Sequence, residues 1–214
     1  MPERTIDDRL REEYFRLLPE MVRTAEHLKT QIQYSLLPIT QELKSHETVV
    51  VKSRVKECIS AIEALRRRYP GTIFDPDRPE IYTLRTLHDL VGIRVLVFPA
   101  SRANQVDSYL RSQFSDWTSD PVIDKETGQQ LATKYFGTYT ESKSRLICEY
   151  QIVSTLIGLF WEVEHAAIYK PAPSLKRLEP VMREQTSAVN SALKAFEDEF
   201  ERQLQKAGIG SSNG

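Results

Sequence analysis

The segment "HDLVGIRVLVF", residues 88–98, decides the fold. From Val91 onward it is a nearly continuous run of β-branched and other apolar residues, which is typical of a buried strand, and Pro99 ends it. Two charged residues interrupt the pattern, because Asp89 lies just before the run and Arg94 lies within it. A carboxylate beside a buried strand is costly unless it has a partner. The segment therefore predicts a strand that also supports a polar site.

Further strands are predicted on both sides of this run, at 47–56, 120–124, 134–139 and 145–153, from period-two alternation or short apolar runs. Helical periodicity predicts helices at 57–69, 102–114 and 154–170. The apolar face of the last helix is expected to consist of Leu156, Leu159, Phe160, Val163 and Ala167. Together these elements indicate an α/β (α+β) fold, with a mixed sheet of about five strands flanked by helices.

Long amphipathic helices are predicted at both ends of the chain, at about 10–44 and about 178–206. In the first helix, apolar residues recur every three or four positions from Tyr14 to Ile32. Pro19 near its start indicates either a kink or a later helix start. The spacing is also heptad-like, so two interpretations stay open: the helices cover the sheet, or they pair between the subunits of a homo-oligomer.

The composition suits one globular core. The chain has 214 residues, of which 40% are hydrophobic, so we expect a single domain over 1–206 and a disordered tail at 207–214.

With 29 basic and 30 acidic residues, no overall field attracts DNA or an anionic membrane. Two cysteines are too few for a disulfide framework, so we expect reduced thiols. Because no signal peptide or membrane-spanning run is present, we expect a cytoplasmic location.

The segment "SRVKECIS", residues 53–60, gathers the first group of candidate site residues. In a strand, Arg54 and Lys56 point to the same face, and Ser60 lies about one turn into the helix that follows. Arg67 adds a further cation along that helix. A strand end that leads into a helix N-terminus, with cations and a hydroxyl, suits the phosphates of a nucleotide. The alternative is a solvated basic surface.

Two carboxylates form the second group, because Asp89 and Glu149 each lie at or within an apolar strand. If they are close in space, they can hold Mg²⁺, or one of them can act as a general base. The alternative is that they are surface residues or pair with Lys56 and Arg94. For Arg94 we expect a supporting salt bridge or a second phosphate contact.

In this order, "RVKECIS", "DLVGIRV", "EYQIVST" and "WEVEHAAIYK" resemble the synthetase domain of the RelA/SpoT alarmone synthetases, over roughly residues 15–170. The resemblance implies a nucleotidyltransferase-like fold. It also implies transfer of pyrophosphate from ATP to the 3′-hydroxyl of GDP or GTP, which gives (p)ppGpp, with Mg²⁺ as cofactor. Since 214 residues leave no room for a separate hydrolase domain, the chain resembles a small single-domain synthetase or a toxin-like relative.

The resemblance also implies roles for individual residues. Asp89 and Glu149 match the catalytic, metal-binding acids, and four residues match the ATP-binding segment: Arg54, Lys56, Ser60 and Arg67. The family's "GYRSLH"-like acceptor segment corresponds to "ATKYFGTYTESKS", residues 132–144, where Tyr135 is expected to stack on the acceptor base and Lys134 to contact its phosphates. The resemblance also implies that Gln151, His165 and Lys170 of the later motifs complete the acceptor site, and Glu164 and Tyr169 match the same signature.

Three departures from the family pattern keep other functions open. The "GYRSLH"-like segment is replaced, Val153 stands in place of an arginine, and Ala64 stands in place of a lysine. The donor half is therefore better preserved than the acceptor half. The first alternative is a relative with another acceptor, such as an adenine nucleotide or the tRNA 3′ end. The second is a degenerate synthetase that serves as a nucleotide-binding or interaction module, and the third is a helical interaction protein.

Overall fold

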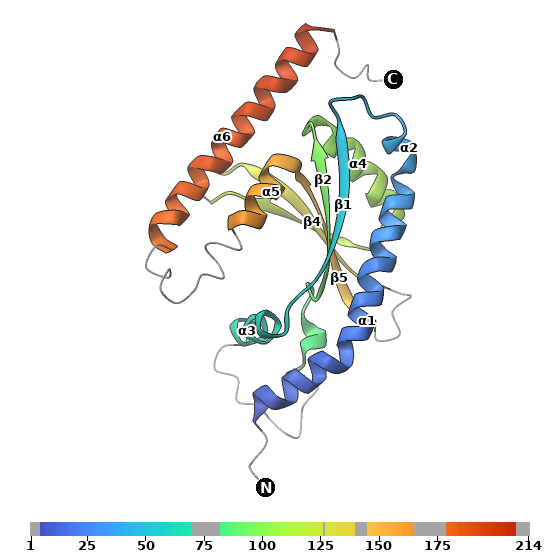
Figure 1. The fold of residues 1–214 in the computed structure, drawn as a ribbon, viewed down its shortest axis with the longest axis vertical. Helices are drawn as coiled ribbons and strands as arrows, with labels where there is room; N and C mark the ends of the chain where they lie inside the picture. The colour runs from blue at the N-terminus through green and yellow to red at the C-terminus, as the bar shows by residue number, and fades with distance from the viewer. Residues whose placement is uncertain (1–4, 70–81, 126, 140–144, 165–178, 209–214) are drawn as a thin grey trace.

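A five-stranded mixed sheet, in the order β1-β2-β5-β4-β3, forms the centre of the protein (Figure 1). The computed structural model describes residues 5–69, 82–125, 127–139, 145–164 and 179–208. The parallel neighbours are β2 and β5, and the other three pairs are antiparallel. The strands are β1 (Thr48–Val55), β2 (Val91–Phe98), β3 (Thr118–Ile123), β4 (Gln130–Thr138) and β5 (Ile147–Ser154). The predicted mixed sheet of about five strands is therefore confirmed.

Long helices lie at both ends of the chain, as predicted. The helical elements are α1 (Ile6–Ser35), α2 (Leu37–Thr40), α3 (Cys58–Arg68), η1 (Leu84–Thr86), α4 (Ser101–Gln113), α5 (Thr155–Glu164) and α6 (Glu179–Lys206). The first helix starts earlier than expected because Thr5 and Asp8 form a capping box. It continues through Pro19 and ends at Ser35, where the short helix α2 follows.

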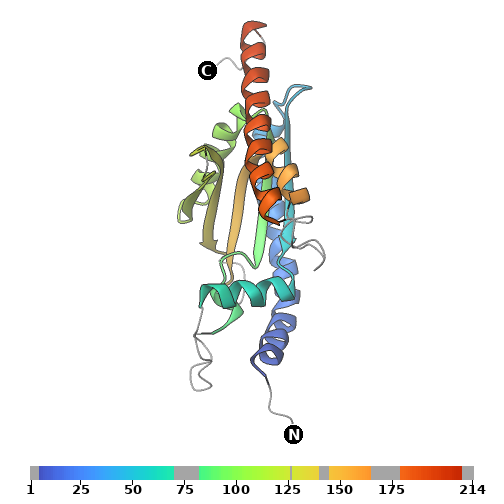
Figure 2. The same cartoon turned by 90° about the vertical axis from the view of Figure 1, so that its left-hand side faces the viewer.

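One face of the sheet is apolar and is covered by α1 and α4 (Figures 1 and 2). The core side chains that α1 supplies include Met21 and Leu28, and α4 supplies Val106 and Leu110. They pack with the strand residues that point to this side, such as Tyr150 on β5, and all five are fully buried. This layer buries most of the apolar surface and holds the sheet rigid.

The opposite face of the sheet is covered by α5 and α6 (Figures 1 and 2). A small second apolar cluster lies here, formed by Leu96, Ala132, Val153 and Ile157. The expected apolar face of α5 is wrong, because Val163 is 65% exposed and Leu159 is 43% exposed. The helix instead contacts the sheet through Ile157 and Gly158, which are both buried. Ala167 lies outside the described residues.

Among the described residues, polar contacts attach α6 to the rest of the fold at three points. Ser187 donates a hydrogen bond to Asp124 after β3 at 3.3 Å, and the backbone N–H of Ser101 donates to Glu201 at 2.5 Å. Between them, the Ser154 hydroxyl donates to Glu197, which is fully buried. Contacts at Ser187, Glu197 and Glu201 fix both the axis and the rotation of α6.

Both cysteines are free, as expected, and burial raises the pKa of the Cys148 thiol to about 12. No helix in the described ranges is long and apolar enough to cross a membrane. The domain limits at 1–206, the disordered tail and helix pairing between subunits stay predictions.

Gly158 sets the distance between α5 and the sheet. A Cβ atom at this position would lie well inside van der Waals contact with Leu96 and Val153. We therefore expect Gly158→Ala to lower the free energy of unfolding by about 1–3 kcal/mol through overpacking. In an unconstrained helix, the same change stabilises by about 0.5–1 kcal/mol. Urea denaturation measures the difference, with Leu159→Ala as the control on the exposed side of α5. A more stable Gly158→Ala variant would contradict this packing.

Candidate active site

The strand register gathers polar side chains on the face of the sheet that α5 and α6 cover. In the sheet, Glu149 on β5 is opposite Gly92 on β2, and Gln151 is opposite both Arg94 and Lys134. On the edge strand β1, Arg54 is opposite Gly92, and Lys52 is opposite Arg94. Residues at matching positions of neighbouring strands point to the same side. Segments far apart in the sequence therefore contribute to a single polar surface.

This surface forms the floor of a cavity of about 640 Å³. Its walls come from the C-terminal half of α5 and the N-terminal half of α6. The residues that line it are Lys52, Ser53, Arg54, Gly92, Ile93, Arg94, Val122, Lys134, Glu149, Gln151, Trp161, Glu162, Glu164, Thr186 and Asn190. Six of the residues selected from the sequence are thus in one cavity: Arg54, Arg94, Lys134, Glu149, Gln151 and Glu164.

Two cations of the cavity have no partner in the part of the chain that the structure describes. Neither Arg54 nor Lys134 forms a hydrogen bond or ion pair with any residue that the structure describes. Arg54 lies across β2 at Gly92, where a Cβ atom would come within 3.0 Å of its Nε atom. Glycine at this position therefore leaves room for the guanidinium on the cavity floor. An anionic ligand can bind both cations without displacing a protein carboxylate.

Glu149 is a buried carboxylate between these cations. Its exposed fraction is 6%, and within the described ranges it has no hydrogen-bond or ion-pair partner. Burial raises the pKa of Glu149 above its ordinary value, and the Asp89 carboxylate acts in the same direction. The charges of Lys134, Arg54 and Lys56 oppose this rise. A carboxylate with a raised pKa in a cavity suits proton transfer or cation binding.

Asp89 lies just before β2, at the end of the sheet where α3 begins. It forms an ion pair with Lys56, as one sequence-based alternative expected, and both side chains are partly buried. Both charges influence the pKa of Glu149, so the two acids belong to one electrostatic group. The described residues contain no cluster of three or more His, Cys, Asp or Glu side chains for a metal. Two carboxylates nevertheless fit Mg²⁺, which commonly takes one or two with substrate phosphates.

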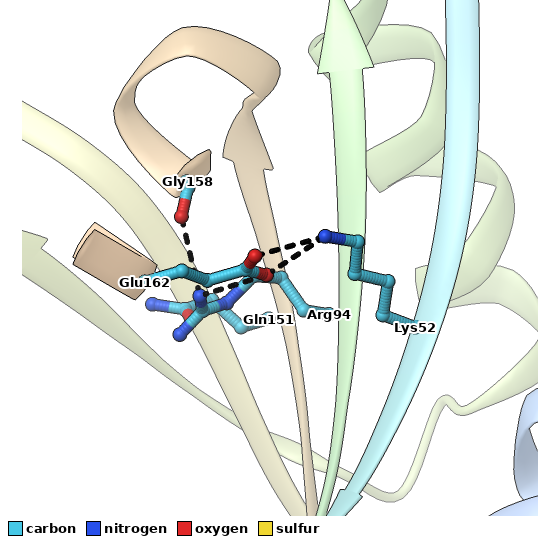
Figure 3. A network of polar contacts seen from close by, with 5 residues as sticks. All are labelled: Lys52, Arg94, Gln151, Gly158 and Glu162. Carbon is cyan, nitrogen blue, oxygen red and sulfur yellow. Dashed lines mark hydrogen bonds and ion pairs between the residues drawn. The ribbon is translucent and has the colours of Figure 1, made fainter. Parts of the chain in front are cut away.

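A polar network links α5 to three strands of the sheet (Figure 3). Arg94 donates from Nε to the Gln151 amide oxygen and from Nη1 to the Gly158 carbonyl oxygen, both at 3.3 Å. Glu162 accepts from Lys52 at 2.9 Å and lies 3.7 Å from Arg94. The salt bridge expected of Arg94 is therefore confirmed. Burial lowers the pKa of Arg94, and the nearby Arg54 adds to this effect.

Other residues selected from the sequence lie away from the cavity. Ser60 and Arg67 are on α3 and do not line it, so their ATP-binding roles stay predictions. Tyr135 is on the opposite face of the sheet, 1% exposed, and its ring stacks on Tyr150 with 4.6 Å between ring centroids. Its hydroxyl bonds to Asp107 and Arg111 in the core layer. The expected stacking of Tyr135 on an acceptor base does not fit this burial.

His165, Tyr169 and Lys170 lie outside the described residues, so their roles stay predictions. Several residues that line the cavity were not singled out in the sequence, among them Lys52, Glu162, Thr186 and Asn190. Strand alternation could have found Lys52, which is two positions before Arg54. The residues on the helices carry no local signal, because their place depends on how α5 and α6 pack.

The fold defines a class: the chain has the fold of the small alarmone synthetases. The crystal structure of small alarmone synthetase 1 from Bacillus subtilis bound to its product pppGpp is 19% identical, with a TM-score of 0.63, 92% of this chain covered and 99% of that chain. The structure of the same enzyme bound to AMPCPP is 17% identical, with a TM-score of 0.63, and the alignment covers 92% of this chain and 98% of that chain. The structure of a GTP pyrophosphokinase family protein from Streptococcus pneumoniae is 18% identical, with a TM-score of 0.62, and the alignment covers 92% of this chain and 95% of that chain.

At these identities, the similarity establishes the fold, and the predicted resemblance to the synthetase domain is confirmed at that level. No protein-family model matches the sequence, and no curated protein matches it.

The raised pKa of Glu149 predicts how stability depends on pH. Between the ordinary value of 4.5 and the raised value, the folded protein binds more protons than the unfolded chain. The free energy of unfolding should therefore fall as pH rises through this interval. We expect Glu149→Gln to be more stable than the wild type at pH 7, by on the order of 1 kcal/mol, and to lose most of this advantage near pH 4.

Chemical denaturation at a series of pH values measures this effect. The control is Glu42→Gln, because Glu42 is exposed on the segment after α2. A Glu149→Gln variant with the same pH dependence as the wild type would show that Glu149 titrates normally.

Proposed function

We propose that this protein is a Mg²⁺-dependent pyrophosphokinase that transfers pyrophosphate from ATP to the 3′-hydroxyl of GDP or GTP and so forms (p)ppGpp. The observation that carries the proposal is the buried carboxylate of Glu149 on the cavity floor, beside Arg54 and Lys134, two cations without a partner among the described residues. This arrangement suits phosphates next to a hydroxyl that loses a proton. Solved structures of the same fold contain pppGpp and AMPCPP, which supports nucleotides as the ligands here.

In this proposal, the two sides of the cavity bind different substrates. Arg54, together with Lys56 at the end of β1, binds the phosphates of ATP, and Lys134 on β4 binds the phosphates of the acceptor. The 3′-oxygen of the acceptor attacks the β-phosphorus of ATP. The bond between this phosphorus and the oxygen that bridges the α- and β-phosphates breaks, and AMP leaves with the electron pair of that bond. Glu149 accepts the proton of the hydroxyl. Its raised pKa, caused mainly by burial, brings it closer to the value that a general base needs.

Asp89 and Glu149 are the residues that would hold Mg²⁺. The ion would neutralise charge that develops on the transferred phosphates. The ion pair with Lys56 keeps the Asp89 carboxylate directed at this end of the sheet. Arg94 is held by Gln151 and the Gly158 carbonyl, so the cavity floor is organised before any ligand binds.

Removing either acid should abolish most of the transfer. We expect Asp89→Asn and Glu149→Gln each to lower kcat by about 100-fold or more, because one affects charge stabilisation and the other proton removal. The assay follows the β,γ-phosphates of γ-labelled ATP into product with GDP, GTP or an adenine nucleotide as acceptor.

Thermal denaturation confirms that the variants fold, and Glu42→Gln serves as the exposed control. Activity with any of these acceptors that survives in both acid variants would contradict the proposed roles. No labelled product from the wild type would favour a degenerate, nucleotide-binding module or a relative with the tRNA 3′ end as acceptor.

A further inference from the structure

The two sides of the cavity differ in the groups that they offer to a ligand. On the side of β1 and β2 lie three cations, Lys52, Arg54 and Arg94. The side formed by β4, α5 and α6 offers one cation, Lys134, together with the ring of Trp161, the uncharged polar side chains of Thr186 and Asn190, and the carboxylates of Glu162 and Glu164. A nucleotide needs contacts for its base as well as its phosphates. The second side supplies contacts of both kinds.

Trp161 is the only aromatic residue among the described residues that line the cavity. It is partly buried and packs against the apolar cluster that contains Leu96 on β2, Ala132 on β4 and Val153 on β5, which places it against the floor of the cavity. Gly158, one turn earlier on α5, holds the helix in close contact with the sheet and accepts a hydrogen bond from Arg94 (Figure 3). The indole is therefore positioned by packing before a ligand binds.

Asn190 on α6 is an unsatisfied polar group in the same cavity. Its side chain is 4% exposed, and its amide oxygen is buried without a hydrogen-bond partner among the described residues. A buried amide without a partner is rare and costs stability, unless a ligand or water satisfies it. The contacts of Ser187 with Asp124 and of Glu197 with Ser154 hold α6 on both sides of Asn190. The amide thus has a fixed place next to the cavity.

We propose that Trp161 and Asn190 form the base-recognition corner for a purine nucleoside diphosphate, with the purine stacked on Trp161 and its polar edge hydrogen-bonded to the Asn190 amide. The inference rests on the proposed function in one respect, that the cavity binds a second nucleotide beside ATP. A purine edge carries both donors and acceptors, so it can satisfy either group of an amide. Lys134 lies on the same side and matches the diphosphate. Trp161 takes over the stacking role that the buried Tyr135 cannot fill.

Binding measured by calorimetry without ATP tests this corner directly. The probes are GDP and ADP, with inorganic pyrophosphate as the base-free comparison and AMPCPP as the probe of the other side. We expect Trp161→Leu to weaken binding of the preferred purine diphosphate by about 5- to 100-fold, the range of a lost stacking contact, and Trp161→Phe to retain most of it. Pyrophosphate and AMPCPP should bind these variants as they bind the wild type.

Asn190→Leu provides a second, independent readout. Because leucine fills similar space without a polar group, we expect this variant to be at least as stable as the wild type and yet to bind the purine diphosphate at least fivefold more weakly. A merely structural asparagine would not give this combination. The exposed neighbours supply matched controls: Val163→Ala on α5 and Val189→Ala on α6. If Trp161→Leu does not fold, the tryptophan fluorescence of the wild type is measured instead. We expect GDP or ADP to quench it and pyrophosphate to leave it unchanged.

The outcomes separate the corner from the proposed reaction. Purine diphosphate binding that depends on Trp161 and Asn190 supports the corner, even if no product forms. Wild-type affinity in the folded Trp161→Leu and Asn190→Leu variants would overturn it, even if the reaction occurs. An equal loss of AMPCPP affinity, or no purine diphosphate binding by the wild type, would overturn it as well.

Discussion

The register of the five strands is the constraint on which the rest of the structure depends. Because side chains alternate along each strand, one face carries the apolar residues that pack on α1 and α4, and the other carries Arg54, Arg94, Lys134 and Glu149. A shift of one residue in any central strand would exchange these faces and bury the charges in the core. The same register therefore stabilises the fold and assembles the polar cavity.

The cost of this arrangement lies at Glu149. A carboxylate that is buried without a protein partner among the described residues opposes folding, as its raised pKa indicates. Functional sites commonly retain groups of this kind, because a ligand satisfies what the protein leaves open. Asn190 on α6 is a second example, because its amide oxygen is buried and has no hydrogen-bond partner among the described residues. At Glu149 and Asn190, the arrangement that favours ligand binding therefore lowers the stability of the fold.

The sequence was sufficient for the parts of the fold that depend on local pattern. The apolar run from Val91 predicted β2 closely, and three- and four-residue spacing predicted both terminal helices. Arg54 and Glu149 were found because a charge on an apolar strand is conspicuous. Strand alternation alone could also have shown that Lys134 and Tyr135 face opposite sides of the sheet. By contrast, Trp161 and Asn190 reach the cavity through Gly158 and the anchors of α6, and such long-range packing has no local signature. For the same reason, the face that α5 buries was predicted wrongly.

The central claim is that two nucleotides bind side by side over the polar face of the sheet, with Glu149 between them. A crystal structure of the protein with AMPCPP, Mg²⁺ and GDP tests it most directly. We expect the triphosphate of AMPCPP at Arg54 and Lys56, the diphosphate of GDP at Lys134, and the GDP 3′-hydroxyl between the Glu149 carboxylate and the β-phosphate. Nucleotides bound elsewhere, such as in a cavity beside α4 that Asp107 and Arg111 line, with the polar face empty, would contradict it.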